Sequence, residues 1–464
     1  MKIGRQKKRP DRLKVFTRRA AILGGLQGVL VAGLASRLYY LQVLENNRYK
    51  MLADENRISV RLIPPPRGRI IDRFGRVMAS NRADYRAFLV PEQTNDLDET
   101  LDALSQILHL TEDDRARIRE AARRQRSFLP VTVAGNLSWE DFARLNMASP
   151  DLPGVQPDVG TTRYYPYGPL LSHVIGYVGA PNQEEAGRDP LLLMPGMRIG
   201  KSGVERTFEK ELRGLAGNMK VEINAYGRVI RELEREEATP GRDLQLTLDL
   251  NLQKFAAERL SAEASASAVC IDIHNGDILA LASMPAFDPN EFNIGIRNAV
   301  WQELLKNERK PLVNKAVAGQ YPPGSTFKMV VALAALEAGV IGPDHEVFCG
   351  GKRQLGNHMF HCWRRQGHGR VNLVNSLKHS CDIFYYEVAD RVGIDKIAEM
   401  AHRLGLGESF DISIPNVASG LIPTREWKKR ATGVSWQRGE TYVAGIGQGF
   451  ILTTPLQLAV MTAR

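Results

Sequence analysis

The sequence predicts an α+β multidomain protein with one membrane-spanning helix near its N-terminus. At 464 residues the chain is too long to fold around one ordinary hydrophobic core, so two or more domains are expected. An apolar segment close to the start is long enough to cross a bilayer. Strand-like alternation and helix-like periodicity both recur after that segment, and these three observations together indicate the fold class.

Positive charge is concentrated in residues 1–19, a basic tail. This tail holds nine Lys and Arg against one Asp, which accounts for +8 of the net charge of +10. Only +2 remains for residues 20–464. The charge is therefore a terminal patch, and the sequence excludes a nucleic-acid-binding surface on the folded part.

Residues 20–44 form the predicted transmembrane anchor. Ala20–Ser36 contains no charged residue, and an apolar stretch after Arg37 continues the segment to Leu44. A cleaved signal peptide is the alternative, because small residues precede Arg37, but the apolar continuation favours an uncleaved single-pass anchor. The positive-inside rule then places the basic tail in the cytoplasm and the bulk of the chain outside it, in the periplasm.

Residues 45–240 are expected to form the first domain outside the membrane. The sequence at 45–62 predicts a helix that leaves the membrane and enters a strand. Pro64–Asn81 predicts a hairpin with a Gly-containing turn, and its Arg and Asp residues suit a domain junction. Residues 97–146 have a helical period, with an exposed charged face at Glu112–Arg126.

A second domain is expected over residues 241–464. The charged segment Arg231–Glu237 and the following Pro240-Gly241 predict a linker in front of it. Leu252–Ala262 predicts a helix, and residues 268–283 predict a β-hairpin with an Asn-Gly turn at its centre.

A serine and a lysine one helical turn apart lie in Tyr321–Met329, which reads Tyr-Pro-Pro-Gly-Ser-Thr-Phe-Lys-Met. The prolines and the glycine end the preceding structure, and an apolar run continues the predicted helix into a core. Ser325 and Lys328 therefore share one helix face. A serine hydroxyl needs a base beside it to act as a nucleophile, and a buried lysine can serve. An ordinary helix start with Ser325 as N-cap is the alternative.

Ser380-Cys381-Asp382 is the second candidate catalytic element. Helix-like segments flank it, so the triplet is expected in a loop between two helices. The Ser380 hydroxyl can relay a proton, and the Asp382 carboxylate can hold the lysine. The triplet alone is too common to indicate a catalytic site. Its interpretation as part of one depends on the presence of Ser325 and Lys328.

Three cysteines and a histidine form a possible metal site. Cys349, Cys362 and Cys381 fall within 33 residues in the pattern Cys-x12-Cys-x5-His-x12-Cys, with His368 as the histidine. Three thiolates and one imidazole suit tetrahedral zinc. Disulfides are the alternative outside the cytoplasm, with Cys270 as a fourth partner, although its expected buried strand favours a core residue. The other histidines available as nitrogen ligands are His345, His358, His361 and His379.

These motifs together resemble the class B penicillin-binding proteins. Tyr321–Met329 resembles their Ser-x-x-Lys motif, and Ser380–Asp382 resembles the Ser-x-Asp second motif of the elongation-type members. Arg67–Gly75 resembles the Arg-Gly-x-Ile-x-Asp-Arg-x-Gly signature of their non-catalytic domain. The resemblance covers nearly the whole chain, and some elongation-type members hold zinc just before the second motif.

The resemblance implies the architecture. Residues 45–240 would form an elongated, β-rich pedestal with a helical head that also serves dimerisation, and residues 241–464 a transpeptidase domain like that of the serine β-lactamases. The family's third motif, Lys-Thr-Gly or Lys-Ser-Gly, does not follow the serine before Arg464. The sequence is therefore expected to be C-terminally truncated, with an incomplete sheet and no activity on its own. Lys201-Ser202-Gly203 precedes the serine, and we interpret it as unrelated to this motif.

The resemblance also implies the reaction, a peptidoglycan D,D-transpeptidation that serves cell-wall elongation and rod shape. Ser325 would attack the D-Ala-D-Ala group of a stem peptide with Lys328 as base, while Ser380 assists the leaving group and Asp382 holds the lysine. The Ser325 N–H would form half of the oxyanion hole, and β-lactams would acylate Ser325. Expected partners are a RodA-type membrane glycosyltransferase and elongation scaffold proteins, with no nucleic acid.

Three alternatives remain open at this point. A class D β-lactamase or a β-lactam sensor shares Ser-Thr-Phe-Lys but needs no pedestal. A septal class B member would share most of the motifs. A non-catalytic platform for a glycan polymerase would need only the pedestal, and this role is compatible with catalysis.

Overall fold

The computed structural model describes residues 12–45, 58–124, 126–187, 189–194, 196–223, 229–293 and 295–464. The chain divides into two compact units. One comprises the N-terminal segment up to Pro64 together with Ala216–Ala238, and the other comprises Pro65–Leu215 together with Thr239–Arg464. The predicted domain boundary near residue 240 stays a prediction.

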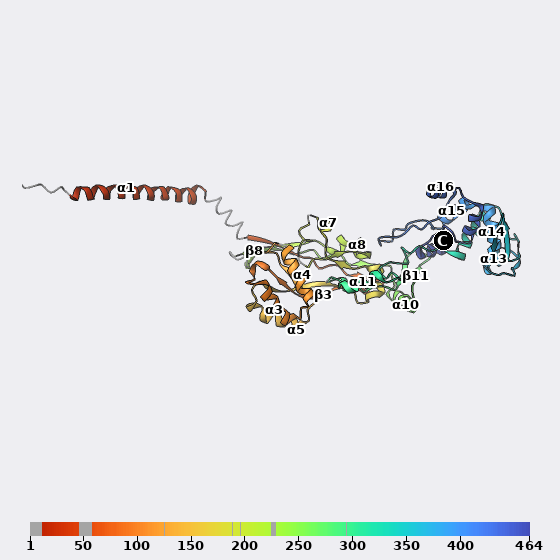
Figure 1. Cartoon of the computed structure of the whole chain (residues 1–464), viewed down its shortest axis with the longest axis horizontal. Helices are drawn as coiled ribbons and strands as arrows, with labels where there is room; N and C mark the ends of the chain where they lie inside the picture. Colours follow the sequence, from red (N-terminus) through yellow and green to blue (C-terminus); the bar gives the residue numbers. More distant parts are fainter. Residues whose placement is uncertain are drawn as a thin grey trace, which may run out of the picture. The chain divides into compact units, whose positions relative to one another are not determined.

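The first unit begins with helix α1 (Arg12–Tyr39), which a π-helical turn η1 (Tyr40–Leu44) extends (Figure 1). Among the described helices, this one alone is long and apolar enough to cross a membrane, over Ala20–Leu44. The helix starts inside the predicted basic tail, because Arg and Lys are themselves good helix formers. Most of the segment 45–62, predicted as a helix that enters a strand, lies outside the described residues. Its last residues form the predicted strand.

That strand belongs to a three-stranded antiparallel sheet in the first unit. Its order is β1 (Ile58–Ile63), β8 (Gly217–Ile223) and β9 (Val229–Glu236). The linker predicted over Arg231–Glu237 is therefore wrong. Cross-strand ion pairs explain how such charged residues form a strand, because Lys220 Nζ lies 2.6 Å from Glu234 Oε2 and Arg231 Nε lies 2.6 Å from Glu222 Oε2.

The second unit opens with the predicted hairpin, formed by β2 (Ile70–Ile71) and β3 (Val77–Leu89). Asp72, which is fully buried, holds its turn by accepting hydrogen bonds from the backbone N–H groups of Phe74 and Arg76. The sheet runs in the order β10-β2-β3-β4, and β5 pairs with β3. The strands not yet given are β4 (Val131–Ala134), β5 (Val155–Tyr164) and β10 (Leu244–Gln245).

A helical head packs on this sheet (Figure 1). It consists of α3 (Leu97–Leu108), α4 (Glu112–Arg124) and α5 (Trp139–Ala148), whose apolar faces bury Leu101, Leu104 and Ile118. The helical prediction over 97–146 is confirmed in part, because β4 interrupts it where buried Val131 and Val133 alternate with partly buried neighbours. Short elements follow in the chain: α6 (Ser172–Ile175), β6 (Val178–Gly179), α7 (Gln183–Ala186), β7 (Ile199–Gly200), α8 (Gly203–Thr207) and α9 (Glu209–Arg213).

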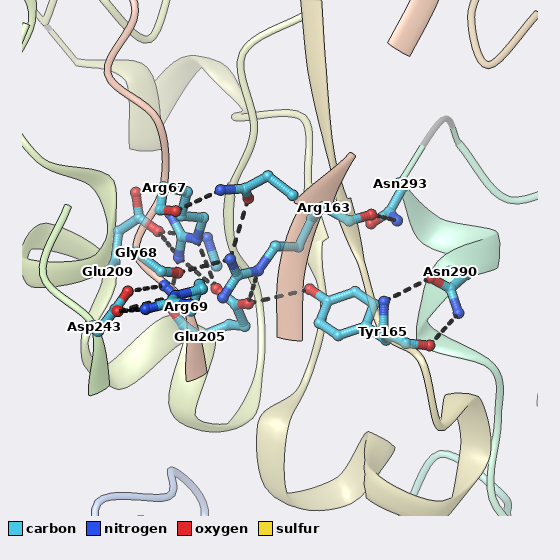
Figure 2. Close-up of polar contacts among 12 residues, drawn as sticks. Arg67, Gly68, Arg69, Arg163, Tyr165, Glu205, Glu209, Asp243, Asn290 and Asn293 are labelled. Carbon is cyan, nitrogen blue, oxygen red and sulfur yellow. Dashed lines mark hydrogen bonds and ion pairs between the residues drawn. The ribbon is translucent and has the colours of Figure 1, made fainter. Parts of the chain in front are cut away.

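A buried polar network ties the segments of this unit together (Figure 2). Arg163 Nε and Arg67 Nη2 each lie 2.6 Å from the carboxylate of Glu205, which is fully buried. Burial alone would raise the pKa of Glu205, but the two guanidinium groups outweigh it and hold that pKa below its ordinary value. Arg69 binds Asp243 at 2.6 Å, which confirms that this stretch carries the Arg–Asp pairing expected of a junction.

Replacing Arg163 by Met should lower the free energy of unfolding by about 3–5 kcal/mol, because Glu205 loses a buried partner. Urea unfolding at neutral pH measures the change. The matched control is Arg144→Met, whose exposed pair with Asp141 is worth less than about 1 kcal/mol. Since the pKa of Glu205 is depressed, its contribution is complete above the ordinary value of 4.5 and disappears as the pH falls below it. Equal losses in both variants would contradict the prediction.

The C-terminal part of this unit begins with α10 (Leu250–Leu260) packed on an antiparallel hairpin of β11 (Ala266–Ile271) and β12 (Ile278–Met284). Both predictions are confirmed to within a few residues at each end. The expectation that Cys270 is buried is wrong, because its side chain is exposed. Cys270 lies beside a register shift near the end of β11, and no other described strand pairs with β11.

A second core, distinct from that of the head, surrounds Phe327, Tyr385 and Ile397. The helices that form it are α12 (Lys328–Glu337), α14 (Asp382–Val392), α15 (Ile394–Arg403) and α17 (Arg438–Gly445). The remaining elements are α11 (Asn298–Lys306), β13 (Val347–Cys349), β14 (Lys352–Leu355), β15 (His358–His361), β16 (Gly369–Val371), α13 (Leu373–Lys378), α16 (Arg425–Thr432) and α18 (Pro455–Ala463). Figure 1 shows α13, α14 and α15 gathered in one part of this core.

Candidate active site

Ser325 lies in a single 3₁₀ turn, η6 (Gly324–Phe327), that leads directly into α12. Its side chain is exposed, whereas Lys328, the first residue of α12, is only 1% exposed. The residue at the N-cap of the turn is Pro323, and no side chain caps it. Ser325 is therefore not the N-cap that the structural alternative required, and the predicted one-turn spacing places an exposed hydroxyl above a buried amine.

Backbone contacts hold this serine turn from behind. The N–H of Gly324 donates to the carbonyl oxygen of Gly447 at 2.9 Å, and Tyr321 and Thr453 exchange two hydrogen bonds of 2.9 Å. Gly447 has φ +71°, and a Cβ atom there would lie 2.2 Å from the carbonyl oxygen of Gly324. Only glycine meets both demands at this position. The sequence did not predict this contact of Gly447 with the turn that carries Ser325.

The four predicted catalytic residues form one hydrogen-bonded chain. Lys328 Nζ lies 2.6 Å from Asp382 Oδ1 and 2.9 Å from both the hydroxyl and the carbonyl oxygen of Ser380. The Ser380 hydroxyl in turn donates to Ser325 Oγ at 2.8 Å. Ser380 thus stands between the candidate nucleophile and the candidate base. The sequence predicted these residues but not this order.

Local backbone geometry explains why Ser380 reaches that position. It lies between α13 and α14, as predicted, in the left-handed region with φ +49°. Cys381 follows as the N-cap residue of α14, and its N–H donates to Ser376 O at 2.9 Å. The tight turn directs the Ser380 hydroxyl and the Asp382 carboxylate at the same atom, Lys328 Nζ.

The surroundings of Lys328 hold its amino group in place. Its Nζ has three oxygen acceptors and lies 5.6 Å from the centre of the Tyr385 ring, close enough for a cation–π contact. Burial raises the pKa of Tyr385 to about 12, so the phenol stays neutral beside the lysine. A proton that leaves Ser325 can reach the lysine through the Ser380 hydroxyl, which is the geometry of an activated serine nucleophile.

The structure also brings together the predicted metal ligands. The ligand atoms of Cys349, Cys362, His368 and Cys381 all lie within 4.8 Å of one another, and all three cysteines are buried. Within the described part of the chain, this group includes none of the four alternative histidines and not Cys270. All four cysteines are free thiols.

The distances in this thiol–imidazole cluster fit a tetrahedral cation. Cys349 Sγ and Cys362 Sγ each lie 3.6 Å from His368 Nδ1. Sulfur and nitrogen ligands at usual zinc bond lengths in a tetrahedron are separated by about 3.5 Å. Burial raises the pKa of the Cys381 thiol, and a divalent cation would reverse this effect by favouring the thiolate. The donor set therefore fits zinc.

A backbone contact links this cluster to the hydrogen-bonded chain of Ser325, Ser380, Lys328 and Asp382. The N–H of Trp363, which follows Cys362 directly, donates to Asp382 Oδ2 at 2.9 Å. Sequence reasoning missed this residue, and only its position next to a predicted ligand could have drawn attention to it. Lys201 of the unrelated Lys-Ser-Gly triplet instead forms an ion pair with Glu185, and Gly203 begins α8.

Comparisons with known protein families divide the chain into two matched regions. Residues 62–246 match the penicillin-binding protein dimerisation domain, and residues 266–464 match the penicillin-binding protein transpeptidase domain. The first region contains the buried network of Arg67, Arg163 and Glu205. The second contains the hydrogen-bonded chain from Ser325 to Asp382 and the thiol–imidazole cluster.

Similar proteins agree with these matches. The peptidoglycan D,D-transpeptidase MrdA of Escherichia coli (strain K12) is 40% identical over 454 residues, which cover 96% of this chain and 71% of that protein. Penicillin-binding protein 2 in its complex with MreC from Helicobacter pylori superimposes with a TM-score of 0.80 at 29% identity, over 88% of this chain and 77% of that one. A peptidoglycan synthase complex that coordinates polymerization and crosslinking contains a chain that matches with a TM-score of 0.67 at 31% identity, over 96% of this chain and 77% of that one.

Proposed function

This chain belongs to the class B penicillin-binding proteins of the MrdA type, and we propose that Ser325 is the nucleophile of its D,D-transpeptidase reaction. Proteins of this type cross-link peptidoglycan in cell-wall elongation. The observation that supports our assignment of residues is the hydrogen-bonded chain from Ser325 through Ser380 to Lys328 and Asp382.

The first half of the reaction forms an acyl-enzyme. Ser325 Oγ attacks the carbonyl carbon between the two D-Ala residues of a stem peptide, and its proton passes through the Ser380 hydroxyl to Lys328. The Ser325 N–H supplies one donor to the oxyanion. The C–N bond then breaks, and the terminal D-Ala leaves as an amine after it takes a proton back along the same path.

The second half transfers the acyl group. An amine of a neighbouring stem peptide attacks the ester, a new amide bond forms, and Ser325 Oγ regains its proton as the C–O bond breaks. Water in place of the amine would give the carboxypeptidase reaction. A β-lactam opens its ring amide on Ser325 in the same way and leaves a stable ester. Asp382 keeps Lys328 in reach of Ser380 throughout.

Labelling with a fluorescent penicillin tests the assignment. The membrane-extracted full-length protein should take up the label with one covalent adduct on the peptide that contains Ser325, and Ser325→Ala should abolish it. Ser202→Ala, in the unrelated Lys-Ser-Gly triplet, is the matched control and should label normally. Labelling that persists in Ser325→Ala would refute the assignment of Ser325 as the nucleophile.

The thiol–imidazole cluster is proposed to hold one structural zinc ion through Cys349, Cys362, His368 and Cys381. Its support is the match between the observed 3.6 Å separations and tetrahedral geometry. The ion would stabilise the loop before Ser380 and would not touch the substrate. Elemental analysis should find about one zinc per chain, and a Cys349–Cys362 disulfide in zinc-free protein would exclude it.

The partners and the location are proposed from the relatives. The apolar helix Ala20–Leu44 fits a single-pass anchor in the inner membrane, with the basic tail in the cytoplasm and the bulk in the periplasm. The Helicobacter pylori relative is in complex with MreC, so we expect an elongation scaffold protein as a partner of this chain. The synthase complex supports a RodA-type glycan polymerase as a second partner. Co-purification with each protein from detergent extracts tests these partners.

The matched dimerisation domain decides against a stand-alone class D β-lactamase or sensor, which would not need residues 62–246. A platform role for this domain is compatible with catalysis. Ser325→Ala separates the two roles, because it should abolish penicillin labelling and still co-purify with the polymerase.

A further inference from the structure

The two oxygens of the Asp382 carboxylate serve different partners. Oδ1 lies 2.6 Å from Lys328 Nζ, and Oδ2 accepts the backbone N–H of Trp363 at 2.9 Å. A carboxylate with one partner can rotate about its own bonds, whereas two partners on opposite oxygens fix its plane. The Trp363 N–H therefore sets the direction in which Asp382 holds the lysine.

The Trp363 side chain is anchored although it is exposed. Its indole N–H donates to the carbonyl oxygen of His379 at 3.1 Å, and its ring lies 5.4 Å from the His368 ring. The side chain is 64% exposed, so burial of apolar surface does not explain its position. The anchor instead fixes the backbone of residue 363 relative to the turn that carries Ser380.

The thiol–imidazole cluster brackets both partners of this hydrogen bond. Cys362 directly precedes the donor Trp363, and Cys381 directly precedes the acceptor Asp382. Their sulfur atoms belong to the same group within 4.8 Å. Anything that holds the two sulfurs together also holds the Trp363 N–H against Asp382.

We propose that Trp363 is a positioning residue for acylation: its backbone N–H orients Asp382 toward Lys328, and the thiol–imidazole cluster acts on catalysis through this N–H. The inference rests on the proposed function of Ser325 and Lys328. It gives the cluster a route to the reaction that needs no contact with the substrate. Residues that orient a reacting group in this way typically change its activity by about 10- to 100-fold when they are lost.

A graded series of variants tests the proposal in the full-length protein. Trp363→Pro removes the N–H, and Trp363→Phe keeps the N–H but loses the indole anchor. Trp436→Phe is the matched control, because it loses an equivalent indole bond to Thr441 Oγ1 at 2.8 Å away from Asp382. The acylation rate constant and the dissociation constant of the non-covalent penicillin complex are measured separately.

We expect the acylation rate constant to fall by about 10- to 100-fold in Trp363→Pro and by up to about tenfold in Trp363→Phe. Trp436→Phe should match the parent, and the dissociation constant should stay unchanged in all variants. A flat series would overturn the proposal. A change in the dissociation constant with a constant rate would also overturn it, because Trp363 would then contact the ligand.

Hydrogen exchange of the residue 363 amide provides a second measurement. If Trp363 had a purely structural role, the exchange rate of this amide would not change together with the acylation rate constant. The amide should exchange faster in Trp363→Phe than in the parent, together with the slower acylation. This result decides the matter even if Trp363→Pro does not fold. Two results in Trp363→Phe would refute the proposed link between this N–H and acylation. One is faster amide exchange with an unchanged acylation rate constant, and the other is no change in either quantity. Failure of the proposed function itself would look different, since Ser325→Ala would then still take up label.

Discussion

Replacing Lys328 by Met should slow acylation by penicillin by about 10²–10⁴-fold, the usual contribution of a general base. The substitution keeps the length of the buried side chain but removes the group that we propose takes the proton of Ser325 through Ser380. Stopped-flow labelling of the full-length protein measures the rate constant. A loss smaller than about tenfold would show that another group accepts the proton.

The loss of Lys328 needs a control of its own, because Asp382 loses a buried partner when Lys328 is replaced. Lys428→Met is a matched control, since Lys428 is buried to a similar degree and pairs with Glu440 outside the catalytic chain. It should lower thermal stability without slowing acylation. The double variant Lys328→Met with Asp382→Asn should recover stability but not the rate, which separates chemistry from folding.

Replacing Cys349 by Ala should release the proposed zinc ion and lower the melting temperature by at least about 5 °C. Zinc binding contributes directly to folding at structural sites, with apparent free energies of about 10–16 kcal/mol in small domains. The remaining donors, Cys362, His368 and Cys381, no longer close a tetrahedron. Zinc content by elemental analysis and the melting temperature by calorimetry are the measurements.

Cys270→Ala is the control for the loss of a thiol, because Cys270 is exposed and lies outside the cluster. It should keep both the zinc content and the melting temperature of the parent. A melting temperature that is equally unchanged in Cys349→Ala would contradict a structural metal. Zinc that is lost from both variants would point to binding elsewhere in the chain.

The candidate catalytic residues were predictable because each motif is local. The spacing of Ser325 and Lys328 follows from one helical turn, and Ser380-Cys381-Asp382 is a short triplet between helices. The cysteine pattern likewise carries its own signal, and the structure gathers the four predicted ligand atoms. Side chains that act directly leave a trace in the sequence.

Contacts of the backbone leave no such trace. The Trp363 N–H that binds Asp382 is present in every residue except proline, so its role depends on the fold alone. The support of the serine turn by Gly447 joins segments more than a hundred residues apart. The order Ser325, Ser380, Lys328 also required three-dimensional coordinates, because Ser380 comes from a different helix pair.

Errors at the level of elements have the same origin. The charged segment that forms β9 suggested a linker, since its cross-strand partners on β8 cannot be read from local composition. Cys270 was expected to be a core residue because its strand was expected to be buried, but the burial of a strand position depends on what covers its face. Both features depend on long-range packing.

The support of the serine turn has a consequence for the evolution of drug tolerance. Because the contact between Gly324 and Gly447 joins main chain to main chain, most point mutations leave it intact. A side chain at Gly447 would collide with the carbonyl oxygen of Gly324 and disturb the turn that carries Ser325. Selection by β-lactams can therefore change the side chains around Ser325 more readily than the backbone contact between Gly324 and Gly447 that supports it.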